Sequence, residues 1–119
     1  MPSDIKNAAR LFKALSDPTR LRILSLLQTD TLCVMDIVTI LGLPQPTISR
    51  HLAYLQKTNL IKGEKKGLWH FYTSNQQSII SPPLQTVLKE NFRSLKQDRK
   101  KSEALHRKGG CCPKTSDKR

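Results

Sequence analysis

The chain has 119 residues, and its 21 lysines and arginines against 9 aspartates and glutamates give a formal net charge of +12. This is the length of one ordinary domain, so a large multi-domain enzyme is excluded. The positive excess favours a polyanionic partner, with nucleic acid first and an anionic membrane surface second. With 37% hydrophobic residues, the chain can bury a modest core that gains from further burial in an oligomer.

No stretch approaches the roughly 20 apolar residues that span a bilayer. The first residues also lack the apolar region of a signal peptide, so we expect a cytoplasmic protein without a membrane partner. The three cysteines, Cys33, Cys111 and Cys112, cannot all pair within one chain. In a reducing compartment we expect free thiols that are available to metals or oxidants.

The spacing of apolar residues predicts four helices in the first half of the chain. They are expected at about residues 4–15, 18–28, 32–41 and 46–57. Asp17 and Pro18 are typical of a helix start, and Gly42 is typical of a helix end. Pro44 and Pro46 predict a rigid turn before the fourth helix, because each proline fixes its own φ and restricts the residue before it.

The fourth predicted helix has two chemically different faces. Ile48, Leu52 and Leu55 fall within about one-sixth of a turn of each other and predict the buried side. The opposite arc carries only side chains that can hydrogen-bond, namely Thr47, Ser49, Arg50, Tyr54 and Lys57. This arc has the chemistry of a nucleic-acid contact surface.

The second half of the chain predicts a hairpin, a helix and a tail. Residues 60–65 and 68–73 indicate two strands joined at Lys66 and Gly67, with a basic tip. After two prolines a last amphipathic helix follows and ends near His106. Its apolar stripe is Leu84, Val87, Leu88 and Leu95. So small a domain cannot fully cover this stripe, which could pair with the first helix across a two-fold axis. From about residue 108, small polar residues predict a flexible tail.

Two helices joined by a tight turn and followed by a basic hairpin are the layout of a winged helix-turn-helix domain. We therefore expect a mainly α fold with a β-hairpin (α+β). The expected boundaries are residues 1–107 for a DNA-binding and dimerisation domain and 108–119 for a basic, cysteine-containing tail. No nucleophile elbow, phosphate loop or H-E-x-x-H motif occurs, so a catalytic function has little support.

Four motifs resemble, in order and spacing, the ArsR/SmtB family of metalloregulatory repressors. They are ALSDPTRLRIL at residues 14–24, LCVMDI at 32–37, SRHLAYL at 49–55 and GLWHFY at 67–72. The resemblance covers about residues 8–75. It implies a bacterial homodimer that uses its terminal helices to dimerise, binds operator double-stranded DNA and is released by an effector.

The predicted DNA surface combines the fourth helix with the hairpin. Base contacts are expected where a helix enters the major groove, at Gln45, Thr47, Ser49 and Arg50. Phosphate contacts are expected along the wing, at Lys62, Lys65 and Lys66. Arg50 is the best candidate for a base. His51 lies at the edge of the buried arc, where the family motif implies a phosphate contact and local packing is the alternative. Trp69 and Tyr72 are expected in the core of the hairpin.

The number of cysteines suits a soft trivalent ion. Arsenite and antimonite are satisfied by three thiolates arranged as a trigonal pyramid. Arsenic-sensing members of the family often carry Cys-Val-Cys-Asp in the third helix, whereas this chain has Met35 in place of the second cysteine. Met35 offers only a neutral thioether and is interpreted as core filling. Cys111 and Cys112 could join Cys33 as ligands, because two preceding glycines let the tail fold back.

Three other interpretations of these residues stay open. The thiols could be inert, or they could sense oxidants in a redox-responsive repressor of the same fold. Zinc sensing through the last helix has Asp98, Glu103 and His106 available but lacks the paired motif that the family uses there. From a different class, a non-specific nucleic-acid-coating protein would need only the basic tail. The main hypothesis is a repressor released by trivalent arsenic or antimony bound to Cys33, Cys111 and Cys112, with no cofactor needed to bind DNA.

Overall fold

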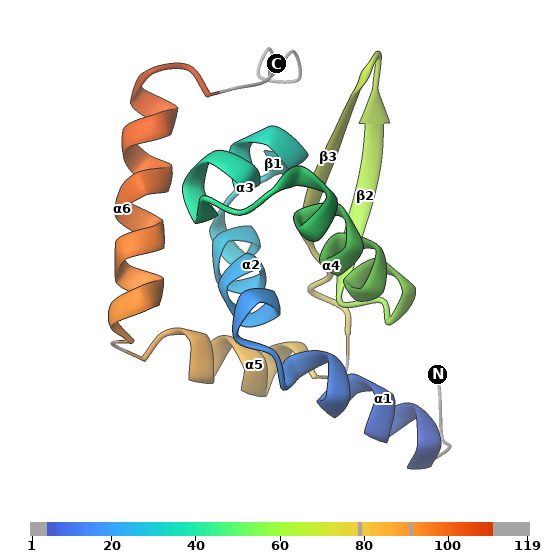
Figure 1. Ribbon diagram of the computed structural model, residues 1–119. Coiled ribbons are helices and arrows are strands. Elements are labelled where there is room, and N and C mark those ends of the chain that lie inside the picture. The colour runs from blue at the N-terminus through green and yellow to red at the C-terminus, as the bar shows by residue number, and fades with distance from the viewer. Residues whose placement is uncertain (1–4, 79, 91, 111–119) are drawn as a thin grey trace.

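The computed structural model describes residues 5–78, 80–90 and 92–110. Within them, the helices are α1 (Ile5–Leu15), α2 (Pro18–Thr29), α3 (Val34–Leu41), α4 (Gln45–Lys57), α5 (Ser81–Leu88) and α6 (Arg93–Arg107). The strands are β1 (Leu32–Cys33), β2 (Ile61–Lys66) and β3 (Trp69–Ser74). Figure 1 shows this order, with the β2–β3 hairpin extending away from the helices. No helix of the described part of the chain is long and apolar enough to cross a membrane.

Helix α2 lies at the centre of the molecule (Figure 1). All five residues from 23 to 27 are buried, because α1, α4, α5, α6 and β3 each contact this helix. A helix that is enclosed on most sides needs apolar residues around most of its circumference. The buried surface of α2 is therefore broad, and it includes Leu26 as well as Leu24 and Leu27.

The helix-turn-helix is formed by α3, a short turn and α4. Gly42 ends α3 in a left-handed conformation with φ of 68°, and its N–H donates to Val38 O at 2.8 Å. Glycine adopts the left-handed backbone conformation most easily, so the helix end predicted at Gly42 is confirmed. Pro44 then precedes α4 in an extended conformation, which fixes the direction in which α4 leaves the turn.

The three strands form one antiparallel sheet in the order β1-β3-β2. Lys66 pairs with Trp69, so the turn is Gly67 and Leu68 rather than the predicted Lys66 and Gly67. Gly67 has φ of 63°, which a tight hairpin turn requires. Leu32 and Cys33 pair with Tyr72 and Phe71. The predicted third helix therefore begins two residues late, because its first residues join the sheet.

The predicted last helix is two helices, with a break between Leu88 and Arg93. Both α5 and α6 pack on α2, in different directions (Figure 1), which one straight helix could not do. Three members of the predicted exposed stripe, Leu84, Leu88 and Leu95, are buried in the chain's own core. Only Val87 stays half exposed, at 50%. The expectation that the domain leaves this stripe uncovered was wrong for the other three residues.

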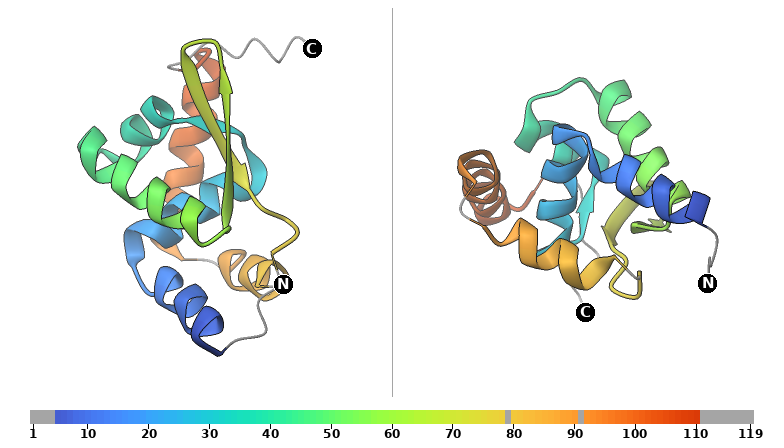
Figure 2. Two further views of the ribbon diagram at one scale, coloured as in Figure 1. Left: turned by 90° about the vertical axis from the view of Figure 1, so that its right-hand side faces the viewer. Right: turned by 90° about the horizontal axis from the view of Figure 1, so that it is seen from below.

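Two predictions of buried side chains also fail. Met35 is 43% exposed, because it points away from the core at the first turn of α3, so it does not fill the core. Trp69 is 37% exposed, because it lies next to the hairpin turn and beyond the helices, whereas Tyr72 is buried opposite Leu32. Helix α1 also has an exposed apolar face, with Ile5 and Phe12 at 80% and 62% exposure, and it projects from the other helices in both views of Figure 2.

Candidate nucleic-acid interface

Helix α4 is held by one face and leaves the other open. Ile48, Leu52 and Leu55 are all at most 1% exposed and pack into the core. On the outer side, Gln45 and Arg50 are exposed, while Thr47 and Ser49 are half-buried. The Gln45 amide donates to Ser49 Oγ at 3.2 Å across the first turn. The predicted base-contacting residues therefore share the N-terminal half of one helix, with Arg50 the longest side chain among them.

The three wing lysines do not form one surface. Side chains alternate along a strand, so Lys62 and Lys66 lie on one face of β2, and Lys65 lies on the other. Lys66 Nζ is 4.0 Å from Glu64 Oε1, which partly offsets its charge. Lys65 shares its face with Gly63, where an added Cβ would approach Gln56 Nε2 of α4 to 3.0 Å. The face that carries Lys65 is thus the one turned towards α4.

Arg20 ties α1, α2 and α4 together. Its Nε donates to Ala14 O at 2.8 Å and its Nη2 donates to Lys13 O at 3.2 Å, at the end of α1. Its guanidinium also lies 4.2 Å from the centre of the Tyr54 ring on α4. Tyr54, predicted as part of the open polar arc, is therefore covered by Arg20. Sequence reasoning assigned Arg20 no role. The available signal was a cation in the first turn of a helix, where the helix dipole disfavours positive charge.

Arg20 and Asp17 both lie beside Nδ1 of His51. Arg20 Nη1 lies 3.3 Å from His51 Nδ1, and a guanidinium can only donate, so Nδ1 must accept. In a neutral imidazole that accepts this bond, the proton sits on Nε2. Asp17 Oδ2 lies 3.8 Å from both His51 Nδ1 and Arg20 Nη1. The side chain of His51 is 20% exposed, so the two alternatives for His51 are compatible: Nδ1 bonds locally while Nε2–H is a remaining donor.

Cys33 lies where β1 meets α3. It is 1% exposed, and its N–H donates to Asp36 Oδ2 at 3.4 Å. Cys33 is disulfide-bonded in this structure, so the expected free thiol is not found at this position. Cys111 and Cys112 lie outside the described residues. Among residues 5–78, 80–90 and 92–110, no group of three or more His, Cys, Asp or Glu side chains could hold a metal ion.

Among the candidate zinc ligands of the last helix, Asp98 is already paired with Arg22. Both carboxylate oxygens of Asp98 accept hydrogen bonds from Arg22, each at 2.9 Å. This contact raises the pKa of Arg22 and keeps the 1% exposed carboxylate of Asp98 paired. Glu103 is exposed on another part of α6. The geometry gives zinc sensing through Asp98 no support.

Comparison with known proteins identifies the family. Residues 17–62 match the model described as "Bacterial regulatory protein, arsR family". An uncharacterized HTH-type transcriptional regulator of Methanocaldococcus jannaschii is 50% identical over 68 residues, which are 56% of this chain and 76% of that protein. The chain belongs to the ArsR family. The matched residues enclose Arg20, Cys33, Arg50 and His51, and their boundaries leave α1, α5 and α6 outside.

Two further proteins are similar to this ArsR-family chain. The arsenical resistance operon repressor of Escherichia coli K12 is 48% identical over 64 residues, or 53% of this chain and 55% of that repressor. This chain thus spans about half the length of that relative. The homodimeric winged helix-turn-helix DNA-binding domain of Mb0332 from Mycobacterium bovis superimposes with a TM-score of 0.64 at 28% identity, covering 70% and 76% of the two chains.

The winged helix-turn-helix fold expected from the sequence is therefore confirmed. ArsR-family proteins are DNA-binding transcriptional regulators and are not enzymes.

Proposed function

We propose that this ArsR-family protein is a homodimeric repressor that binds a palindromic operator through α4 and the β2–β3 wing. The observation that carries the proposal is the open N-terminal half of α4, which is fixed from behind by a buried apolar face. Gln45, Thr47, Ser49 and Arg50 contact bases in the major groove. His51 and the wing lysines Lys62, Lys65 and Lys66 contact phosphates.

The dimer and the domain boundaries belong to the same proposal. The apolar side chains exposed on α1, Ile5 and Phe12, supply an isologous surface together with Val87 and Phe92, which are each 50% exposed. Residues 1–107 form the DNA-binding and dimerisation domain. Residues 108–119 form the tail that carries two of the three cysteines.

The proposed effector is trivalent arsenic or antimony. The E. coli relative is named as an arsenical resistance operon repressor, and soft trivalent ions prefer thiolates. Cys33, Cys111 and Cys112 would supply three sulfurs, which requires the reduced protein. Cys33 lies at the N-terminus of α3, and α3 packs on α4, so a constraint at Cys33 acts on the helix that contacts the operator. By linkage, operator DNA must weaken effector binding by the same factor, typically about 5- to 150-fold.

A titration of the reduced protein tests this function. An operator fragment is first selected from random duplexes, and its binding is followed by fluorescence anisotropy as arsenite, antimonite, zinc and cadmium are added. We expect a footprint confined to one palindrome and release by arsenite or antimonite only. Uniform coating of any duplex would instead identify the non-specific nucleic-acid-coating protein.

The cysteine variants separate repression from sensing. Cys33→Ser and a deletion of residues 109–119 should both keep operator affinity while raising the arsenite concentration needed for release, because a hydroxyl is a poor ligand for arsenic. The deletion also removes Lys114, Lys118 and Arg119, so its non-specific affinity should fall slightly. If the deletion variant releases DNA at the wild-type arsenite concentration, the tail cysteines are not ligands.

A redox-responsive repressor is the second candidate, and the disulfide at Cys33 favours it. Oxidation of a thiol at the start of α3 would act on α4 through the same contact as the ion. Operator affinity is compared between protein treated with a phosphine reductant and protein treated with peroxide. A large difference that Cys33→Ser removes, with no effect of arsenite on the reduced form, would replace the arsenic sensor by the redox sensor.

A further inference from the structure

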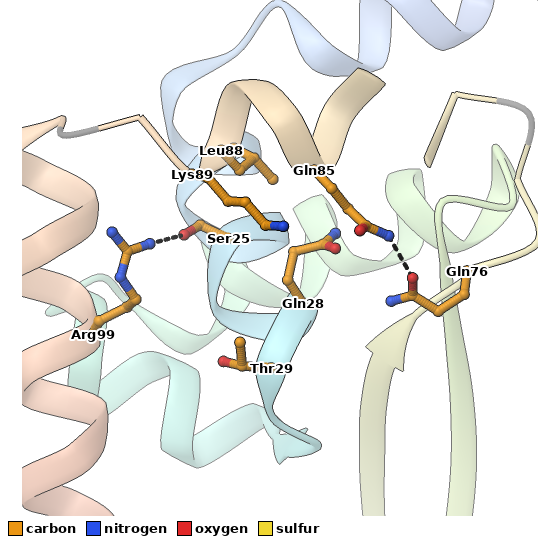
Figure 3. Close-up of a pocket in the computed structure, with 8 residues that line it drawn as sticks. All are labelled: Ser25, Gln28, Thr29, Gln76, Gln85, Leu88, Lys89 and Arg99. Carbon is orange, nitrogen blue, oxygen red and sulfur yellow. Dashed lines mark hydrogen bonds between the residues drawn. The ribbon is translucent and has the colours of Figure 1, made fainter. Parts of the chain in front are cut away.

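A hollow of about 350 Å³ lies between α2, α5 and α6 (Figure 3). The volume is within the range of pockets that hold small molecules. Its polar lining includes Ser25 and Gln28 of α2, Gln85 of α5, Lys89 just after α5, and Arg99 of α6. Helix α2 thus meets α5 and α6, which lie far from it in the sequence, at one hollow.

Arg99 is held differently from the other arginine of the α2–α6 contact. Arg22 donates two hydrogen bonds of 2.9 Å to the nearly fully buried carboxylate of Asp98. Arg99 is the next residue along α6, but its Nη1 donates to a neutral acceptor, Ser25 Oγ, at 3.2 Å. Ser25 is 3% exposed, so this bond fixes the guanidinium at the wall of the hollow (Figure 3). A guanidinium has five N–H donors, and among the described residues most of those of Arg99 are left for another acceptor.

A second cation faces the same space. In Figure 3 the Lys89 ammonium and the Gln28 amide both point into the hollow. No Asp or Glu lines it, and among the described residues the ion pairs within 4.0 Å involve neither Lys89 nor Arg99. Gln85 is already bonded to Gln76 and to Ser81, so it shapes the rim. The hollow therefore presents two positive charges and one amide without a negative partner.

We propose that this hollow is a binding site for a small molecule that carries an oxyanion group, a phosphate or a carboxylate. Arg99 contacts the oxyanion with its planar donors, Lys89 adds the second charge, and the Gln28 amide contacts a neighbouring polar group. The bound anion is the negatively charged hydrogen-bond partner of Arg99, as the Asp98 carboxylate is for Arg22. It also bridges α2, α5 and α6. The site goes beyond the proposed function and does not depend on the identity of the arsenic-type effector.

The test is a titration of the whole protein with inorganic phosphate and, separately, with glutarate, at constant ionic strength maintained by chloride. Backbone amide resonances of Ser25, Gln28 and Lys89 are followed by NMR. Arg99→Gln and Lys89→Gln each remove one charge from the site, and Lys96→Gln removes the same charge from an exposed position of the same helix as Arg99. The two probes distinguish a phosphate from a carboxylate ligand.

We expect a saturable shift at these three residues with at least one probe. Arg99→Gln should weaken this binding about tenfold or more, Lys89→Gln should weaken it several-fold, and Lys96→Gln should leave it unchanged. Lys89 is exposed, so its variant tests the site even if Arg99→Gln disturbs packing. The absence of a saturable shift with both probes, or equal weakening by Lys96→Gln, would overturn the proposal and leave only diffuse screening of a basic protein.

Discussion

At the scale of single residues, Arg20 connects three helices. It is a cation in the first turn of α2, where the helix dipole disfavours it, yet it bonds two carbonyls of α1, His51 and the face of Tyr54. We expect Arg20→Met to lower the free energy of unfolding by about 2–3 kcal/mol, because hydrogen bonds from a charged group and a cation–π contact are lost. Urea unfolding at neutral pH measures this change.

The position of the proton on the His51 imidazole provides a sharper test of the role of Arg20. In the wild type, nitrogen NMR of the neutral imidazole should show the proton on Nε2, because Arg20 occupies Nδ1. Arg20→Met should give a mixture of the two tautomers, and Arg20→Lys should restore Nε2–H only in part, since an ammonium lacks the planar fork. A proton on Nδ1 in the wild type would show that Asp17, rather than Arg20, is the partner of His51.

Arg50 and Lys65 allow base contacts to be separated from phosphate contacts. Arg50→Ala should cost about 1–3 kcal/mol of operator binding and relax the sequence preference. Lys65→Ala should weaken all duplexes alike and reduce the slope of log affinity against log salt by about 1. Anisotropy titrations at several salt concentrations with specific and scrambled duplexes measure both effects. Identical behaviour of the two variants would contradict the assignment of α4 to the major groove.

Tyr72 predicts a loss of stability at high pH. Burial disfavours the phenolate and raises the pKa of Tyr72 above its ordinary value of about 10. As pH rises above about 10, the unfolded chain loses this proton while the folded chain keeps it, so unfolding becomes more favourable. Tyr72→Phe should remove this part of the alkaline loss. Urea unfolding at pH 8 to 11 compares the two proteins, and identical alkaline curves would contradict the argument.

At the scale of elements, α6 depends on its contact with α2. Its sequence is strongly polar, and Leu95 is buried beside the paired Asp98 and Ser102. Besides the Arg22–Asp98 pair, Ser102 Oγ donates to Asp30 Oδ2 at 3.3 Å. Helix α6 is therefore fixed by specific polar partners on α2 and immediately after it, as well as by apolar burial.

The Arg22–Asp98 pair should be the strongest of these partners. Asp98→Ala leaves a guanidinium that is 28% exposed without its carboxylate, so we expect a loss of about 2–3 kcal/mol in the free energy of unfolding. Glu103→Ala, which removes an exposed acid from the same helix, should change stability by less than about 0.5 kcal/mol. Denaturant unfolding of both variants provides the measurement, and equal effects would show that the pair contributes little.

At the scale of the whole molecule, the exposed face of α1 predicts a dimer that exists without metal. We expect sedimentation to show a dimer at micromolar concentration in the presence of a chelator. Phe12→Asp should shift it towards monomer, because a carboxylate would enter an apolar interface. Leu68→Asp makes the same kind of change at the wing tip, where the side chain is 93% exposed, and should leave the dimer intact. A monomeric wild type would refute the dimer.

Local sequence patterns were sufficient for much of the fold. Gly42, Pro18 and Pro44 mark helix boundaries through their own backbone preferences, which act over a few residues. The period of Ile48, Leu52 and Leu55 located the buried face of α4, and so the open face that carries Arg50. These features depend on neighbours in sequence, and family motifs at the same positions indicated the ArsR family.

Only the tertiary structure decided the features that depend on distant partners. Leu32 and Cys33 become a strand because β3 offers an unpaired edge, and the last helix breaks because α5 and α6 must both cover α2. Arg20 meets His51 across 31 positions, and Arg22 meets Asp98 across 76. A periodic pattern shows which residues face inward but not which partner they meet, because side-chain pairing is set by how the elements pack in space.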